Sequence, residues 1–441
     1  MSIIIRNGRV LLGEPAQEVF CDIKIEQGLI TETGSAVRAE NARVIDASGK
    51  LVLPGLVDTH SHYISGSGAG FYMAVSSGVT TALEPIVGDV RVARQKVAGS
   101  PVGMTCACLY MLAPGRSLSG ISPARPEIEK VMESAVSSGA WGVKILGAHY
   151  PFTPEATALM IQIAAEKQIP LMLHAGSTVS RDDFNGMQEA VTLADGNPFI
   201  LAHVNTYCTG SVLGDQCREA LEALDLLKKN PQIISESTLS PLSCIGTKMD
   251  ENDIPASLCM IDILSSLGYD GTYQGMLKAV EDRKLLVSGP LEDARRFDFL
   301  EHNAGVGRFK EQHGAVTIGY AKHSMLKNAI CASGKNQEGD FIISTLSTDG
   351  GLVPRNVVLE KGLGLVDAGI LSLPEFVQKS SRNGAKILGL SNKGVISPGF
   401  DGDIVIADPI SRKAETVISG GKTVFCRGIF SEADNTFYAQ K

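Results

Sequence analysis

Five apolar segments of this chain each end in a residue that can bind a metal ion. Each segment reads as a buried strand followed by small or polar residues, which is how a strand delivers one side chain to an open rim. Only eight histidines occur in 441 residues, and four of them lie in these segments. In chain order the candidate ligands are His60 and His62, Lys144, His174, His203 and Asp349.

Between the outer parts of the chain, predicted strands alternate with predicted helices, as in a parallel α/β barrel. Residues 125–138, 154–167 and 215–229 have apolar residues at helical period. Strand ends are expected near His62, Glu84, Leu109, Lys144, His174, His203 and Ser235, and the eighth near Asp349. The long gap before that last strand predicts an insertion of about residues 240–338. Loops that follow barrel strands form the active-site face, so this insertion is expected to cover or wall the pocket.

The two ends of the chain show a different sequence pattern from the part between them. Residues 1–54 and 394–441 contain short apolar runs split by glycine turns, which predicts strands. We therefore expect a small β domain built from residues 1–54 and 394–441, and a barrel over residues 55–393.

Composition narrows the functional class. The formal net charge of −8 disfavours a nucleic-acid-binding groove. No uninterrupted apolar run reaches membrane length, and the start of the chain does not read as a signal peptide. Nine cysteines without framework spacing indicate a reducing compartment. We expect a cytoplasmic protein that acts on a small molecule and contacts neither nucleic acid nor membrane.

The residue types suit a metal centre. Alternate residues of a strand share a face, so His60 and His62 point the same way. Neutral imidazole is a common ligand for zinc and similar ions, and the carboxylate of Asp349 can both bind a metal and accept a proton. Each residue alone also fits an ordinary role: a core histidine, a lysine extending from a strand end, or an aspartate in a turn. It is the ordered set that favours the metal centre.

The order His-x-His, Lys, His, His, Asp resembles that of the amidohydrolase superfamily. The resemblance implies a (β/α)8 TIM barrel, with a small β-sandwich formed by both chain ends. It also implies two divalent metal ions held by His60, His62, Lys144, His174, His203 and Asp349. Zinc is the expected metal, and manganese is the alternative. In that family the lysine is carboxylated and bridges the metals, which a buried amine of lowered pKa permits.

The segments around the ligands narrow the resemblance to the isoaspartyl dipeptidase, D-aminoacylase and hydantoinase branch. They are Gly142-Val143-Lys144, His174-Ala175-Gly176-Ser177, His203-Val204-Asn205 and Ser347-Thr348-Asp349-Gly350-Gly351. Isoaspartyl dipeptidases bind the charged ends of a dipeptide with a glutamate after the first strand and with arginines after the fourth and sixth strands. In this chain the loop from Tyr63 to Tyr72 has no acidic residue, and the loops after the fourth and sixth strands have no arginine. We therefore expect a less charged substrate, which is a cyclic amide or an N-acyl compound. Separately, we expect the enzyme to be a homo-oligomer.

The resemblance also implies a mechanism. A hydroxide shared by the metals attacks the carbonyl, and Asp349 carries the proton to the leaving nitrogen. Tyr110 is the candidate donor to the oxyanion, because a tyrosine serves there in related dipeptidases. His149 and Asn205 follow ligand-bearing strands and are expected to contact the substrate. Glu84 is open to two interpretations, a substrate contact or a buried structural acid.

Three other functions are compatible with parts of the pattern. An ester or lactone hydrolase could use the same ligands. A hydrolytic deaminase of the same superfamily is the nearest rival. Those deaminases place a glutamate soon after the fifth-strand histidine, where this chain has Ala175-Gly176-Ser177-Thr178. A non-catalytic metal-binding relative is the third.

Overall fold

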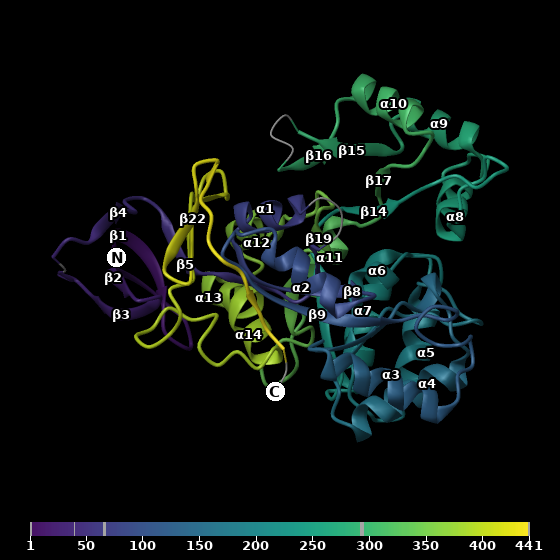
Figure 1. Ribbon diagram of the computed structural model, residues 1–441, viewed down its shortest axis with the longest axis horizontal. Coiled ribbons are helices and arrows are strands. Elements are labelled where there is room, and N and C mark those ends of the chain that lie inside the picture. Colours follow the sequence, from purple (N-terminus) through teal and green to yellow (C-terminus); the bar gives the residue numbers. More distant parts are fainter. Residues whose placement is uncertain (1, 39, 65–67, 292–294, 440–441) are drawn as a thin grey trace.

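The structure is a computed structural model that describes residues 2–38, 40–64, 68–291 and 295–439. Residues 65–67, in the loop after the first barrel strand, therefore lie outside the description. Figure 1 shows three parts: a barrel with its helices, a sheet built from the two chain ends, and a separate lobe above the barrel. Within the described residues, no helix is long and apolar enough to cross a membrane.

The barrel consists of eight parallel strands that form a nearly closed ring. Their short apolar sequences are almost fully buried, as expected for parallel strands covered on both faces. The strands are β6 (Leu56–Asp58), β8 (Val79–Val87), β9 (Thr105–Leu112), β10 (Gly142–Ile145), β11 (Leu171–Leu173), β12 (Ile200–Leu201), β13 (Ile234–Thr238) and β18 (Thr345–Ser347). This arrangement confirms the predicted TIM barrel.

Helices cover the outside of the barrel. Side chains at their N-terminal ends explain where several begin: Asp89, Thr153, Asp183 and Asp215 each accept a backbone N–H of the helix that follows. The outer helices are α1 (Ala69–Ser76), α2 (Val90–Ala98), α3 (Arg125–Ser137), α4 (Pro154–Glu166), α5 (Phe184–Ala194), α7 (Gln216–Lys228), α11 (Met325–Ser333), α12 (Val358–Asp367), α13 (Leu373–Val377) and α14 (Asn383–Ile387).

The first and last strands meet through the residues that follow them. β7 (Ser61–His62) pairs in parallel with β19 (Gly350–Gly351). The backbone N–H of Asp349 also donates to the carbonyl of His60 at 2.8 Å. The seam that closes the barrel is therefore made by the segments that carry three of the candidate ligands.

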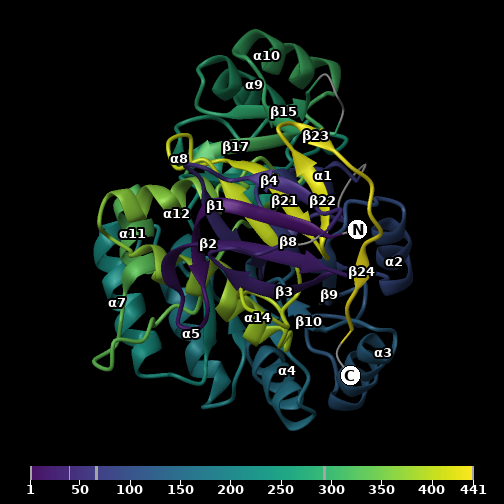
Figure 2. The same cartoon turned by 90° about the vertical axis from the view of Figure 1, so that its left-hand side faces the viewer.

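The two chain ends form one curved sheet beside the barrel (Figure 2). They meet where β5 (Leu51–Pro54) pairs antiparallel with β20 (Ile404–Ala407). Isoleucines from both ends, among them Ile5, Ile23 and Ile418, pack into one core. The other strands are β1 (Ile3–Leu12), β2 (Gln17–Glu26), β3 (Leu29–Gly34), β4 (Arg43–Asp46), β21 (Ala414–Ser419), β22 (Lys422–Cys426) and β23 (Ile429–Phe430). Near the C-terminus, β24 (Thr436–Phe437) instead pairs with β9 of the barrel.

The insertion after β13 forms a lobe with its own core. Four antiparallel strands, in the order β14-β17-β15-β16, pack against three helices around Met276, Phe309 and Ile318. The elements are β14 (Leu242–Gly246), α8 (Leu258–Ser266), α9 (Tyr273–Glu281), β15 (Leu286–Pro290), β16 (Phe297–Phe299), α10 (His302–Glu311) and β17 (Thr317–Ala321). α11 follows the lobe but packs on α7 of the barrel, so the lobe itself spans Leu242–Ala321.

The seam predicts a strong requirement for glycine at position 351. Gly351 has φ +87°, and an added Cβ would lie 2.4 Å from the backbone of His62. Gly369 also has a positive φ, +70°, but nothing lies within 4 Å of its Cβ position. A left-handed conformation costs an alanine roughly 1–2 kcal/mol. Gly351→Ala should therefore lower the free energy of unfolding by clearly more than Gly369→Ala in urea denaturation. Equal losses would mean that the close approach at the seam is unimportant.

Candidate metal centre

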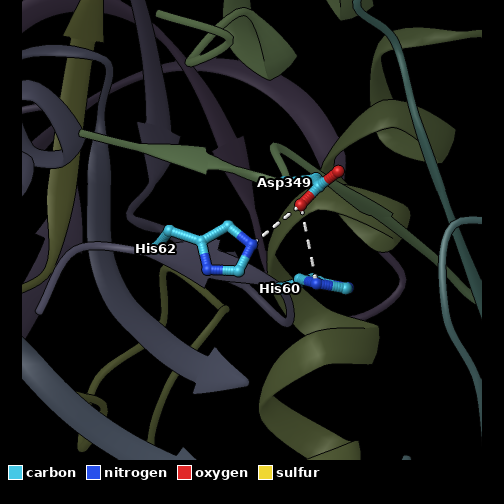
Figure 3. Close-up of side chains that lie close together, drawn as sticks. All are labelled: His60, His62 and Asp349. Carbon is cyan, nitrogen blue, oxygen red and sulfur yellow. Dashed lines mark hydrogen bonds and ion pairs between the residues drawn. The ribbon is translucent and has the colours of Figure 1, made fainter. Parts of the chain in front are cut away.

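Three ligand side chains meet at the seam. Asp349 Oδ1 lies 3.0 Å from His62 Nε2 and 3.6 Å from His60 Nε2. Figure 3 shows both imidazoles directed at this carboxylate oxygen. One donor atom from each residue lies within 4.8 Å of the others, which is compact enough to hold one ion. Tetrahedral zinc sites commonly use two imidazoles and a carboxylate of this kind.

A second pair of histidines lies beside this group. His174 follows β11, and His203 begins the short helix α6 (Val204–Tyr207). His174 Nδ1 is 3.1 Å from His203 Nε2, and the rings of His60 and His203 are 5.1 Å apart. Burial holds the pKa of both His174 and His203 well below its usual value, so both rings are neutral and can bind a metal.

Lys144 completes the set from β10. It is buried, and its Nζ has no hydrogen-bond partner within the described residues; the same holds for His174 Nε2 and His203 Nδ1. Leaving a buried polar atom unpaired is costly, and such atoms commonly mark a missing ligand or ion. Burial also lowers the pKa of Lys144 to about 8. Three unpaired nitrogens of these types in one place fit a group that accepts nitrogen ligands, as divalent metals do.

Two buried glutamates stand behind the seam histidines. Glu236, on β13, has Oε1 at 2.7 Å from His60 Nδ1, and it also accepts the backbone N–H of His203. Glu84, on β8, has Oε1 at 3.4 Å from His62 Nδ1 and accepts the backbone N–H groups of Ile64 and Ile86. A carboxylate on the far nitrogen fixes the ring of a metal-binding histidine. Glu84 is thus a buried acid that orients His62.

Asp349 is held in its ionised form and in a fixed orientation. Arg355 Nη2 lies 2.8 Å from its Oδ2, which leaves Oδ1 toward the histidines. Burial raises the pKa of Asp349, but Arg355 and His62 outweigh that effect and hold it well below the usual value. Asp349 and His203 also adopt positive φ angles of 45° and 28°. Such strained backbone is concentrated at functional sites, where the surrounding structure enforces it.

These residues open into one cavity of about 500 Å³ at the C-terminal ends of the strands. In barrel enzymes this is the catalytic face. The inserted lobe forms part of the wall through Ser243, Cys244, Ile245, Gly246, Cys259, Ile263 and Tyr320. The barrel adds, besides the ligands, Ile86, Met111, Arg116, Leu146, His149, Tyr150, Asp182, Thr206 and Arg355, and Lys322 lies just after the lobe. The lobe therefore walls the pocket.

Of the other predicted site residues, His149 lines the cavity and two do not. Tyr110 pairs in register with Val143, on the opposite face of the sheet from Lys144, and packs against the hydrophobic core. Asn205 is buried and occupied by hydrogen bonds to Thr238 and Asn328. Strand alternation turns Tyr110 away from the cavity, and the turn into α6 directs Asn205 into its hydrogen bonds with Thr238 and Asn328.

The absence of charged groups from the predicted substrate loops does not leave the cavity uncharged. The dipeptide-binding arginines are absent from the loops where that branch has them, but Arg116, Lys322 and Arg355 line the cavity from other segments. Among the aromatic residues near the rim, Tyr63 and Phe152 are fully buried, whereas Tyr150 and Tyr320 line the wall. Loop composition alone could not reveal which distant segments converge.

Comparisons with known proteins agree with the amidohydrolase resemblance. The model of the amidohydrolase family matches residues 321–429. A dihydroorotase from Streptococcus pyogenes is 33% identical over 110 residues, which are 22% of this chain and 26% of that protein. This chain thus spans about a quarter of the length of that relative. A dihydroorotase from Geobacter metallireducens is 24% identical over 435 residues, covering 93% of this chain and 90% of that one.

The fold is shared with solved structures over the whole chain. The N-acyl-D-glutamate deacylase from Bordetella bronchiseptica, solved with zinc and a phosphonate inhibitor, has a TM-score of 0.70 at 15% identity, covering 99% of each chain. These matches confirm the resemblance to the amidohydrolase superfamily that the ligand order indicated.

The position of Glu236 predicts a role in metal affinity. Glu236→Gln should weaken zinc binding by roughly 10–100-fold, because the His60 ring loses the carboxylate that orients it. Zinc titration against a competing chelator measures this. Glu219→Gln is the matched control, because Glu219 is also a buried acid but binds the backbone of Gly210, Val212 and Leu213 away from the cavity. Unchanged zinc affinity in Glu236→Gln would contradict the assigned role.

Proposed function

We propose that this chain is a metal-dependent hydrolase that cleaves a C–N amide bond in a cyclic amide or an N-acyl compound. The observation that carries the proposal is the convergence of five histidine and aspartate donors and an unpaired buried lysine on one cavity. Support comes from the similar proteins, which include dihydroorotases and an N-acyl-D-glutamate deacylase, enzymes that act on C–N bonds.

The donor set divides into two groups, each suited to one divalent ion. Zinc is the expected metal at both positions, and manganese is the alternative. His60, His62 and Asp349 would hold one ion, and His174 and His203 the other. We propose that Lys144, carboxylated on Nζ, bridges them. Bound metal ions of this kind lower the pKa of a coordinated water and polarise a carbonyl group.

The chain's own residues then supply positioning and proton transfer. Asp349 is held ionised by Arg355 and can accept a proton on Oδ1 and pass it to the leaving nitrogen. His149 lines the wall next to His174, with ring centroids 4.8 Å apart, where it can contact the substrate. The lobe supplies part of the cavity wall, so it is placed to contact a bound substrate.

The direct test is a screen of purified, zinc-loaded protein against hydantoins, dihydropyrimidines, lactams and N-acyl amino acids. Esters, lactones and aminopurines serve as the competing classes. Hydrolysis of at least one amide class supports the proposal. Turnover confined to esters, or to release of ammonia from an exocyclic amine, would assign the site to a different reaction. Protein that binds zinc at this site but turns over none of these compounds would favour a binding role.

Lys144 gives the first prediction for this mechanism. Lys144→Ala should remove most of the activity, because it takes away the bridging group. Added short carboxylic acids, such as acetate or propionate, should restore part of it, since they can occupy the space of the missing carboxylate. Activity in a titration with these acids is the measurement. Full activity without added acid would rule out the bridge.

Asp349 gives the second prediction. Asp349→Asn should lower kcat by about 10²–10⁴-fold, the range for loss of a proton-transfer residue. Steady-state kinetics with zinc content measured on the same sample separate this from metal loss. If kcat stays within about threefold of the parent, Asp349 is not the proton carrier.

A further inference from the structure

The charged groups around the cavity are not fully balanced. Two of its cationic side chains already have a carboxylate partner: Arg355 pairs with Asp349 at 2.8 Å, and Lys322 pairs with Asp182 at 3.3 Å. Arg116 also lines the cavity, but among the described residues no carboxylate pairs with it. Lys144 is also unpaired but belongs to the proposed metal ligands, so Arg116 is the remaining cationic side chain of the described wall that is available to a bound anion.

Arg116 is presented by a tight loop between β9 and α3. The loop is closed by backbone bonds from Gly115 N–H to the Leu118 carbonyl and from Arg116 N–H to the Ala113 carbonyl. The hydroxyl of Ser117 accepts the backbone N–H of Ala113 at 2.8 Å, which fastens the loop a second time. The backbone that carries Arg116 is thus ordered before any ligand arrives, which reduces the entropy that binding must offset.

The side chain of Arg116 is also oriented. Its Cζ lies 4.6 Å from the centre of the Tyr150 ring, and both residues line the cavity. Tyr150 directly follows η1 (Gly147–His149), which follows the strand that carries Lys144. A guanidinium that stacks on an aromatic face keeps its N–H edge free, and that edge matches the two oxygens of a carboxylate.

We propose that Arg116 recognises a carboxylate on the substrate, remote from the scissile amide. The substrate is then an N-acyl amino acid or a cyclic amide bearing a carboxylate, rather than an uncharged amide. This inference rests on the proposed C–N hydrolysis for the reaction, but the subsite itself is a binding property. Lys322 also lines the cavity and adds positive potential, while its pair with Asp182 holds it in place.

The test uses matched pairs of compounds that differ only in charge. In N-(p-toluenesulfonyl)glycine and its carboxamide a sulfonyl group replaces the scissile N-acyl group, so calorimetry with the zinc-loaded protein measures binding without cleavage at that position. N-acetylglutamate with its amides, and hydantoin-5-acetate with its acetamide, then measure KM and kcat. Each pair is compared in the parent, Arg116→Gln and Arg116→Lys. Arg427→Gln is the control, because Arg427 is 78% exposed and lies on the chain-end sheet, paired with Glu415.

The parent should bind the carboxylate member about tenfold or more tightly than the carboxamide, the effect of a charge-assisted hydrogen bond. Arg116→Gln should abolish that preference, raise KM for the acidic substrate and leave kcat nearly unchanged. Arg116→Lys should restore only part of the preference, and Arg427→Gln should match the parent. Equal binding of the pair, binding of neither member, or a preference that survives Arg116→Gln overturns the inference. A preference that Arg116→Gln removes, in protein that hydrolyses no amide, keeps the subsite but refutes the proposed function.

Discussion

The structure depends on the seam between the first and the last barrel strands. β6 and β18 are joined through β7 and β19 and by the hydrogen bond from Asp349 N–H to the His60 carbonyl. The same backbone segments carry His60, His62 and Asp349. Closing the barrel and building half of the metal centre are therefore one structural event. This explains why Gly350-Gly351 follows the aspartate, since a side chain at position 351 would collide with the His62 backbone.

The interior of the site is costly to fold without a ligand. Lys144, His174 and His203 bury nitrogens that find no partner among the described residues, and Asp349 is buried in a strained conformation. Buried unpaired polar groups cost on the order of 1–3 kcal/mol each, so this arrangement persists only because the rest of the barrel stabilises it. Metal binding would offset this cost, and it would do so only in the folded state. Stability and function are linked through the same atoms.

Much of this could be predicted from the sequence, because the ligands lie at strand ends and strand order fixes where they meet. His60, Lys144 and His203 come from different strands, yet a closed parallel barrel must bring their ends together. The supporting groups were harder to predict. Glu236 directly follows Ser235, the predicted strand end, and only the register places its carboxylate behind His60. Asn205, next to His203, turns instead into a buried network with Thr238 and Asn328.

The residues of the pocket wall were the hardest part of the site to predict from the sequence. Tyr110 and Met111 are adjacent, and a shift of one residue decides which faces the cavity, because side chains alternate along a strand. Arg116 and Lys322 lie more than two hundred residues apart in the chain, yet both line the same cavity. No local sequence pattern encodes that shared position. The chemistry of the metal centre can be inferred from ligand order, whereas substrate choice is set by long-range packing.

The most direct test of the proposed metal centre is the crystal structure of the zinc-loaded protein, with the ions located by anomalous scattering. We expect two peaks per chain, one between His60, His62 and Asp349 and one beside His174 and His203. We also expect the electron density of Lys144 to extend beyond Nζ by a carboxyl group between the two peaks. Absence of metal from this cavity, or ions bound while an unmodified Lys144 points away from both, would contradict the proposed centre.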